Sequence, residues 1–138
     1  MDTVSLHFLA LLITVPAVLY GDHLGVAYVT GRSATIPQKK IVWTHRAVMA
    51  GLLLLIATGV ATALPMWEIL LEKPLFYAKL ACVTTLLINS FFINALMHKA
   101  SAATYASLGK DEQHVLLVSG GVSVCSWIAA ALIGLYGL

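Results

Sequence analysis

Four apolar stretches, each long enough to cross a lipid bilayer, occupy most of this 138-residue chain. A transmembrane helix needs about 20 apolar residues to cross a hydrocarbon core of about 30 Å. The mean hydropathy of +0.93 and the charged share of only 10% lie far from the averages of soluble domains. The sequence therefore predicts an all-α fold, a single integral membrane domain built as an antiparallel four-helix bundle. The predicted spans are residues 4–29, 41–64, 75–97 and 115–138.

The distribution of basic residues predicts the orientation of this bundle. Short loops on the cytoplasmic side of a membrane carry an excess of Lys and Arg. Six of the eight basic residues fall in or beside loops 30–40 and 99–114, against two on the side of the termini. We therefore expect an inner-membrane protein with both termini outside, with the lipid bilayer as its partner and no nucleic acid. The six are Arg32, Lys39, Lys40, Arg46, Lys99 and Lys110.

Polar residues recur inside the apolar spans, which is where function is expected. An ionisable side chain costs about 2.5–3.5 kcal/mol at the centre of a bilayer, so such residues usually face a bundle interior. At 1.5 Å per residue, Asp22 lies roughly 9 Å past the middle of the first span, toward the loop 30–40 side. Four histidines and Asn94 are expected at a similar height. These residues are His23, His45, Asn94, His98 and His114.

Imidazoles gathered at one height suit the binding of a transition metal or a haem. Neutral imidazole is a good ligand for iron, copper and zinc, and a four-helix bundle can hold haem b between two histidines. His45 and Met49 stand four residues apart on one helix face, a spacing that also suits copper. Interfacial positions are the alternative for His98 and His114, and a solvated pair with Arg46 is the alternative for His45. His23 projects about 100° from Asp22, so only one of these two can point into the core.

A second polar group is expected at the opposite end of the bundle. His7 lies one turn into the first span, and Lys79 lies one turn into the third. Lys79 shares a helix face with Ser90, Asn94 and Met97, which gives a polar seam along the third span. Such a seam can carry protons or ions, or can hold helices together through hydrogen bonds.

The residues of three spans resemble the small HemJ-type membrane proteins, the oxygen-independent protoporphyrinogen oxidases, and more distantly the CopD-like copper resistance proteins. The similar segments are Leu6-His7-Phe8-Leu9, His45-Arg46-Ala47-Val48-Met49 with Thr58-Gly59, and Tyr77-Ala78-Lys79-Leu80. The resemblance implies a haem b protein that passes electrons from a porphyrinogen toward the respiratory chain. It assigns functional roles to His7 and Lys79.

The leading hypothesis is thus a haem b-binding, redox-active membrane protein with a porphyrin or quinone as partner. The alternatives are a copper- or zinc-handling protein and a small structural or assembly subunit, which would form a homo-oligomer through small-residue helix faces. Cys82 and Cys125 are expected to be buried free thiols. The candidate catalytic residues are Lys79 and Asp22, the candidate cofactor ligands are His7, His23, His45, Asn94 and His98, and the candidate metal ligands are His23, His45 and Met49.

Overall fold

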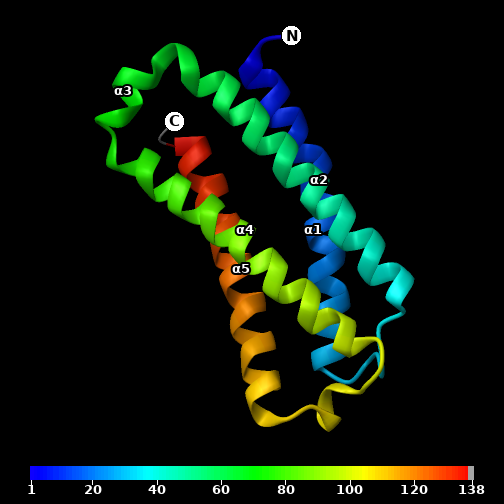
Figure 1. Cartoon of the computed structure of the whole chain (residues 1–138). Coiled ribbons are helices and arrows are strands. Elements are labelled where there is room, and N and C mark those ends of the chain that lie inside the picture. The colour runs from blue at the N-terminus through cyan, green and yellow to red at the C-terminus, as the bar shows by residue number, and fades with distance from the viewer. Residues whose placement is uncertain (137–138) are drawn as a thin grey trace.

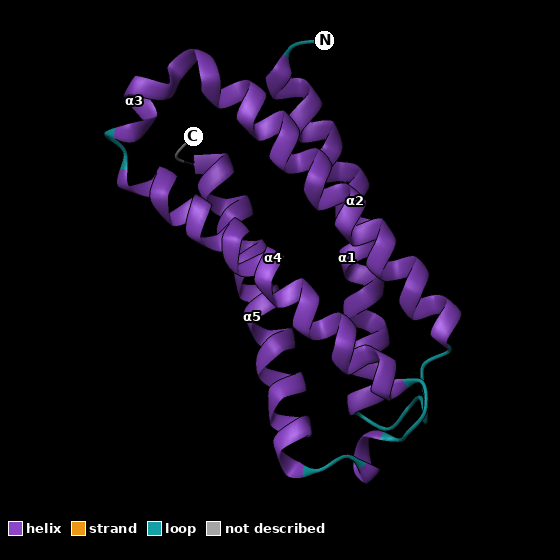
Figure 2. Ribbon diagram, in the orientation of Figure 1, coloured by secondary structure: helices purple, strands orange, loops and turns teal. Residues whose placement is uncertain are grey.

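The computed structural model describes residues 1–136, and within them the chain is helical apart from short connections (Figure 1; Figure 2). No strand occurs in this range. The elements in order are α1 (Thr3–Val29), α2 (Gln38–Ala63), a 3-10 turn η1 (Leu64–Met66), α3 (Trp67–Leu71), α4 (Pro74–Ala100), a second 3-10 turn η2 (Tyr105–Ser107) and α5 (Lys110–Tyr136).

Four helical segments are long and apolar enough to cross a membrane, which confirms the predicted all-α four-helix architecture. Two boundaries differ most from the predicted spans, and the others lie within three residues of them. The second segment continues from α2 through η1 and α3 to Leu71, because Pro65 tightens the chain into a 3-10 turn without ending its helical course. The fourth helix begins at Lys110, since Asp111 and Glu112 in its first turn are favourable at the positive end of the helix dipole. Residues 137–138 of the predicted fourth span lie outside the described residues.

The bundle consists of two helical hairpins, α1 with α2 and α4 with α5 (Figure 1). Most contacts between helices lie within these two hairpins. The hairpins meet mainly through α2 and α4, while α1 and α5 make little contact with each other. The N-terminus and the end of α5 lie at the same end of the molecule, as the antiparallel prediction requires (Figure 1).

The largest group of buried side chains lies at the opposite end, which we call the loop end. Ile36 and Ala100 are almost fully buried there, and the N–H of Ile36 donates to the Ala100 carbonyl at 3.0 Å. The hydroxyl of the buried Tyr28 donates to the Ala103 carbonyl at 2.8 Å. These two bonds tie the connection after α1 to the end of α4. The core residues at this end are Tyr28, Ile36, Ile41, Ala100 and Leu116.

Small and polar side chains hold each hairpin together. Gly51 of α2 lies directly against the buried Thr14 of α1, so that a Cβ at Gly51 would overlap the Thr14 side chain. In the other hairpin, the Ser119 hydroxyl donates to Asn89 Oδ1 at 2.6 Å, and Asn89 Nδ2 donates to the Ser119 carbonyl at 2.8 Å. Close approach at small residues and interhelical hydrogen bonds are how membrane helices associate without a hydrophobic driving force.

Most large apolar side chains point outward. Leu12 of α1, Leu53 of α2 and Phe91 of α4 are each more than half exposed. Helices that are apolar on all sides are typical of membrane spans, where lipid covers the outer faces. Both cysteines are free, as predicted, but only Cys82 is partly buried; Cys125 is exposed, which corrects the expectation that both are buried.

Candidate cofactor site at the terminal end of the bundle

His7 of α1 makes a defined hydrogen bond at the end of the bundle that carries the termini. Its Nδ1 lies 2.9 Å from the hydroxyl oxygen of Thr58 on α2. The Thr58 hydroxyl proton is already directed to the backbone, because its Oγ1 donates to the Leu54 carbonyl at 2.8 Å. Thr58 Oγ1 can therefore only accept from the ring, so that Nδ1 carries the proton and Nε2 keeps its lone pair. This is the imidazole form that binds metals and accepts protons.

Lys79 of α4 approaches the same place from the second hairpin. Its ammonium is close enough to His7 to interact with the imidazole electrostatically. Lys79 Nζ also lies 3.3 Å from the point that a Cβ on Gly134 of α5 would occupy. Within residues 1–136, the Lys79 ammonium has neither a carboxylate nor a hydrogen-bond partner. A positive charge of this kind in an apolar bundle is costly unless an anionic group pairs with it.

Two glycines make room for these side chains. A Cβ at Gly59 of α2 would lie 3.4 Å from the Cε1 atom of His7. The missing side chain of Gly134 likewise leaves space beside the Lys79 ammonium. His7 thus contacts Thr58 and Gly59 within the first hairpin, and Lys79 contacts Gly134 within the second, both at the terminal end of the bundle. We call these five residues the terminal-end site.

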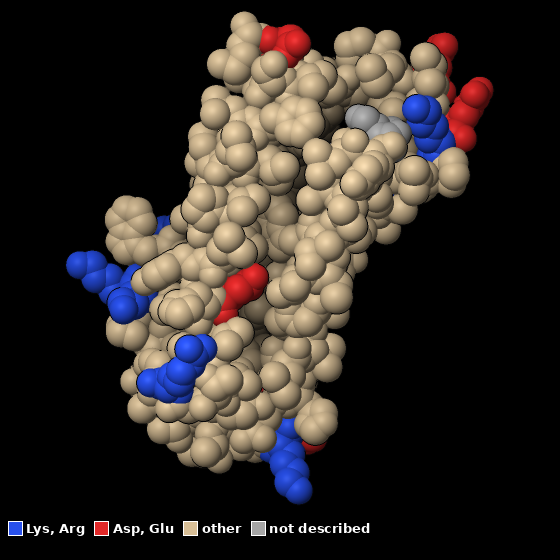
Figure 3. All heavy atoms as spheres, turned by 180° about the vertical axis from the view of Figure 1, so that it is seen from behind, with Lys and Arg blue, Asp and Glu red and all other residues tan. Residues whose placement is uncertain are grey.

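The neighbouring residues Asp22 and His23 on α1 differ in burial, as expected for side chains that project about 100° apart. Asp22 is partly buried, whereas His23 is exposed. A furrow runs between the two hairpins on the back of the molecule, and an acidic side chain lies inside it (Figure 3). Asp22 is the only acidic residue in the apolar part of the four spans. Asp22 is thus the more buried of these two neighbours, and His23 is the more exposed.

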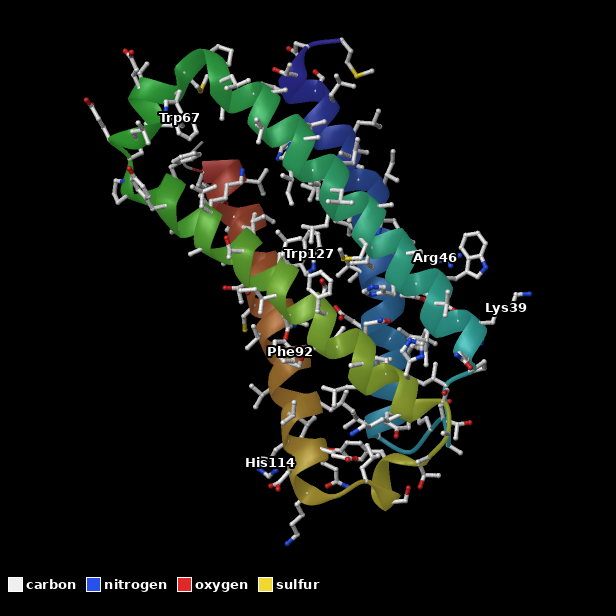
Figure 4. The ribbon with its side chains drawn as sticks, viewed as in Figure 1. Lys39, Arg46, Trp67, Phe92, His114 and Trp127 are labelled. Atoms are coloured by element: carbon white, nitrogen blue, oxygen red, sulfur yellow. The ribbon has the colours of Figure 1, made fainter. Side chains whose placement is uncertain are left out.

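The other candidate ligands lie nearer the loop end. His45 of α2 is partly buried and lies within electrostatic reach of His98 of α4, which is exposed. Met49 and Asn94 are partly buried, and the Asn94 amide makes no hydrogen bond to any described residue. His114 lies on the outer side of α5, with its Nδ1 3.1 Å from the Lys110 carbonyl (Figure 4).

Of the predicted histidines, the structure brings only His45 and His98 near each other among the described residues. Within residues 1–136, no group of three or more His, Cys, Asp or Glu side chains is placed to hold a metal ion. The role of Thr58 was not apparent from the sequence, although the Thr58-Gly59 step is part of the family resemblance described above. Gly134 was not a candidate site residue either. Both gain significance from side chains on other helices, which sequence spacing does not reveal.

The comparisons with known proteins leave the site to be interpreted on its own geometry. No protein-family model, no curated protein and no solved structure matches this chain.

Proposed function

We propose that the protein is a small haem b-binding, redox-active membrane protein, with His7 as an axial ligand of the iron. The observation that carries this proposal is the hydrogen bond from His7 Nδ1 to Thr58, which leaves Nε2 available. Histidines that bind metals almost always donate their other ring N–H to a neighbouring acceptor, which fixes the tautomer and the ring orientation. When bound, haem b supplies an iron that exchanges single electrons.

The scarcity of ligands favours haem over a bare metal ion. A copper or zinc ion takes most of its ligands from the protein, whereas a porphyrin brings four nitrogen atoms and needs only one or two axial ligands. The terminal-end site offers one histidine, and no group of three ligating acids, thiols or imidazoles occurs in residues 1–136. Copper binding at His45 and Met49, with His23, remains the alternative.

Lys79 gives a reason for a porphyrin in particular. Haem b carries two propionate groups, and an ammonium without a carboxylate partner is a suitable group to bind one of them. In this proposal Lys79 holds an anionic substituent, and His7 holds the metal. The resemblance to the HemJ-type proteins supports the same two residues, His7 and Lys79. Electron exchange with a porphyrinogen or a quinone would follow from that resemblance, with the partly buried Asp22 as a candidate proton carrier.

An absorption spectrum combined with metal analysis tests the proposal. The protein is purified after expression with a haem precursor, and His7→Ala is compared with His114→Ala, whose imidazole lies outside the site. We expect a Soret band with stoichiometric iron, lost in His7→Ala and kept in His114→Ala. Copper or zinc without iron would favour the metal-handling alternative. Purified protein without iron, copper or zinc would reject the haem proposal and would leave a structural or assembly subunit as the remaining hypothesis.

A further inference from the structure

A groove of about 370 Å³ lies on the surface of the first hairpin, beside the start of α2. It is separate from the terminal-end site, because α2 begins at the loop end of the molecule and Thr58 lies near its other end. The groove lies between the second half of α1 and the first turns of α2. Its lining residues are Tyr20, Pro37, Lys39, Lys40, Trp43 and Thr44.

The groove carries positive charge that no described acidic residue neutralises. Lys39 and Lys40 are both exposed, and the ion pair found in residues 1–136 joins Lys99 to Glu112 elsewhere. The first turn of α2 contains no acidic residue, and Pro37 provides no side-chain cap for its free N–H groups. The positive end of the helix dipole therefore adds to the two ammonium groups. Lys39 projects away from the bundle at this point (Figure 4).

Aromatic side chains border the same groove. Trp43 is 69% exposed and Tyr20 is 44% exposed, although both lie within spans that are otherwise apolar. Trp and Tyr are enriched where a membrane span meets the lipid headgroups, because their rings are apolar and their polar atoms reach water. The lysines in the first turn of α2 lie about one turn further out. The lysines thus lie nearer the end of the span and the aromatic side chains lie deeper. This order matches that of the phosphate and the acyl chains in a phospholipid.

We propose that this groove binds the headgroup of an anionic phospholipid. Lys39 and Lys40 hold the phosphate, together with the free N–H groups at the start of α2. Trp43 and Tyr20 pack against the glycerol and the upper part of the acyl chains. Basic pockets at the ends of membrane spans recognise anionic headgroups in this way. A lipid is favoured over a free phosphate ion because two of the six lining residues, Tyr20 and Trp43, are aromatic and lie within apolar spans.

Native mass spectrometry of the detergent-purified protein tests the proposal, with phosphatidylglycerol as the probe. Each basic residue near an anionic surface contributes about fivefold to binding, so Lys39→Gln with Lys40→Gln should weaken phosphatidylglycerol binding about 30-fold. The matched control is Lys73→Gln with Lys110→Gln, which removes the same charge from two exposed residues outside the groove. Circular dichroism checks that both double variants keep their helix content. Equal binding by the two double variants would overturn the proposal.

A thermal-stability measurement separates the lipid from other sources of phosphate. We expect phosphatidylglycerol to raise the unfolding temperature of the unmodified protein, and phosphatidylcholine or inorganic phosphate to have a much smaller effect. Trp43→Ala should reduce the effect of phosphatidylglycerol while leaving the lysines in place. An equal effect of the two lipids would contradict recognition of the anionic headgroup. Full stabilisation by inorganic phosphate alone would contradict the lipid.

Discussion

At the scale of single residues, the orientation of one hydroxyl determines what His7 can do. Thr58 Oγ1 donates to the Leu54 carbonyl, as threonine commonly does within a helix, and so acts as a pure acceptor toward the imidazole. This arrangement connects the backbone of α2 to the protonation state of a side chain on α1. The tautomer of His7 is therefore fixed by its hydrogen bond to Thr58.

Replacing Thr58 by Val tests this connection. Valine keeps the shape of threonine but removes the acceptor, so His7 remains in place with its tautomer no longer fixed. Loss of such a supporting bond typically lowers metal affinity by about 10- to 100-fold. We expect that weakening in a haem titration followed at the Soret band. Thr62→Val is the control, since Thr62 donates only to the Thr58 carbonyl. An unchanged haem affinity in Thr58→Val would show that the bond does not support the ligand.

Asp2, which lies outside the membrane spans, caps the N-terminus of α1 in a way that depends on pH. Its Oδ1 accepts the Ser5 N–H at 2.8 Å and so caps α1. Hydrogen bonds from the side chain and the backbone of Ser5 lower the pKa of Asp2 below its ordinary value of 3.8. The capping contribution is therefore complete above that value and is lost as the pH falls through the lowered pKa.

An NMR titration of the first turn of α1 can follow this loss. The Ser5 amide shift should follow the ionisation of Asp2 with a midpoint below pH 3.8. Asp2→Asn retains an acceptor but cannot ionise, so the Ser5 amide should then show no transition in the same range. A midpoint above 3.8 in the unmodified protein would contradict the cap.

At the scale of elements, the contact between α1 and α2 depends on the absence of a side chain at Gly51. Thr14, which faces this glycine, is 1% exposed, and its hydroxyl donates to the Ala10 carbonyl at 2.7 Å. The threonine side chain is therefore fixed in position and cannot move aside easily. The two backbones stay close only while Gly51 leaves the space free.

Gly51→Ala should separate the two helices locally. Forcing an extra methyl group into a packed contact costs about 1–3 kcal/mol. We expect that loss in reversible unfolding by SDS, followed by circular dichroism. Gly121→Ala is the matched control, because nothing lies within 4 Å of a Cβ at that position. Equal stability of the two variants would show that the α1–α2 contact adjusts freely.

The elements also show which features local sequence can predict. Apolar runs of sufficient length predict all four spans, because lipid requires continuous hydrogen-bonded helices. The ends were harder to predict. Lys110, Asp111 and Glu112 are polar, yet they extend α5, since a helix end outside the hydrocarbon tolerates charge. The terminal-end site was predicted only in part: His7 and Lys79 stand out as polar residues in apolar helices, whereas Thr58 and Gly134 become partners only through packing.

At the scale of the whole molecule, the excess of basic residues at the loop end still predicts the orientation in the membrane. The structure places the N-terminus and the end of α5 at the same end of the molecule, and the choice of membrane face is a prediction from charge. Cys82 and Cys125 can be replaced to give a background in which single cysteines report accessibility.

Labelling of single cysteines in intact cells tests the orientation. In that background, Glu72→Cys and Ser107→Cys place exposed thiols at opposite ends of the bundle. A membrane-impermeant maleimide should label Glu72→Cys in intact cells, and Ser107→Cys only after permeabilisation. The reverse pattern would mean that the termini and the terminal-end site face the cytoplasm.

The helices pack more closely within each hairpin than between the two hairpins, and this difference has a consequence for assembly. Each hairpin completes most of its contacts internally, and the buried cluster around Tyr28 and Ala100 fastens the pair at the loop end. The hairpins can therefore insert into the bilayer one after the other, while the chain from η1 to the start of α4 keeps them connected at the terminal end. The buried residues at the loop end then fasten the two hairpins at the other end of the bundle.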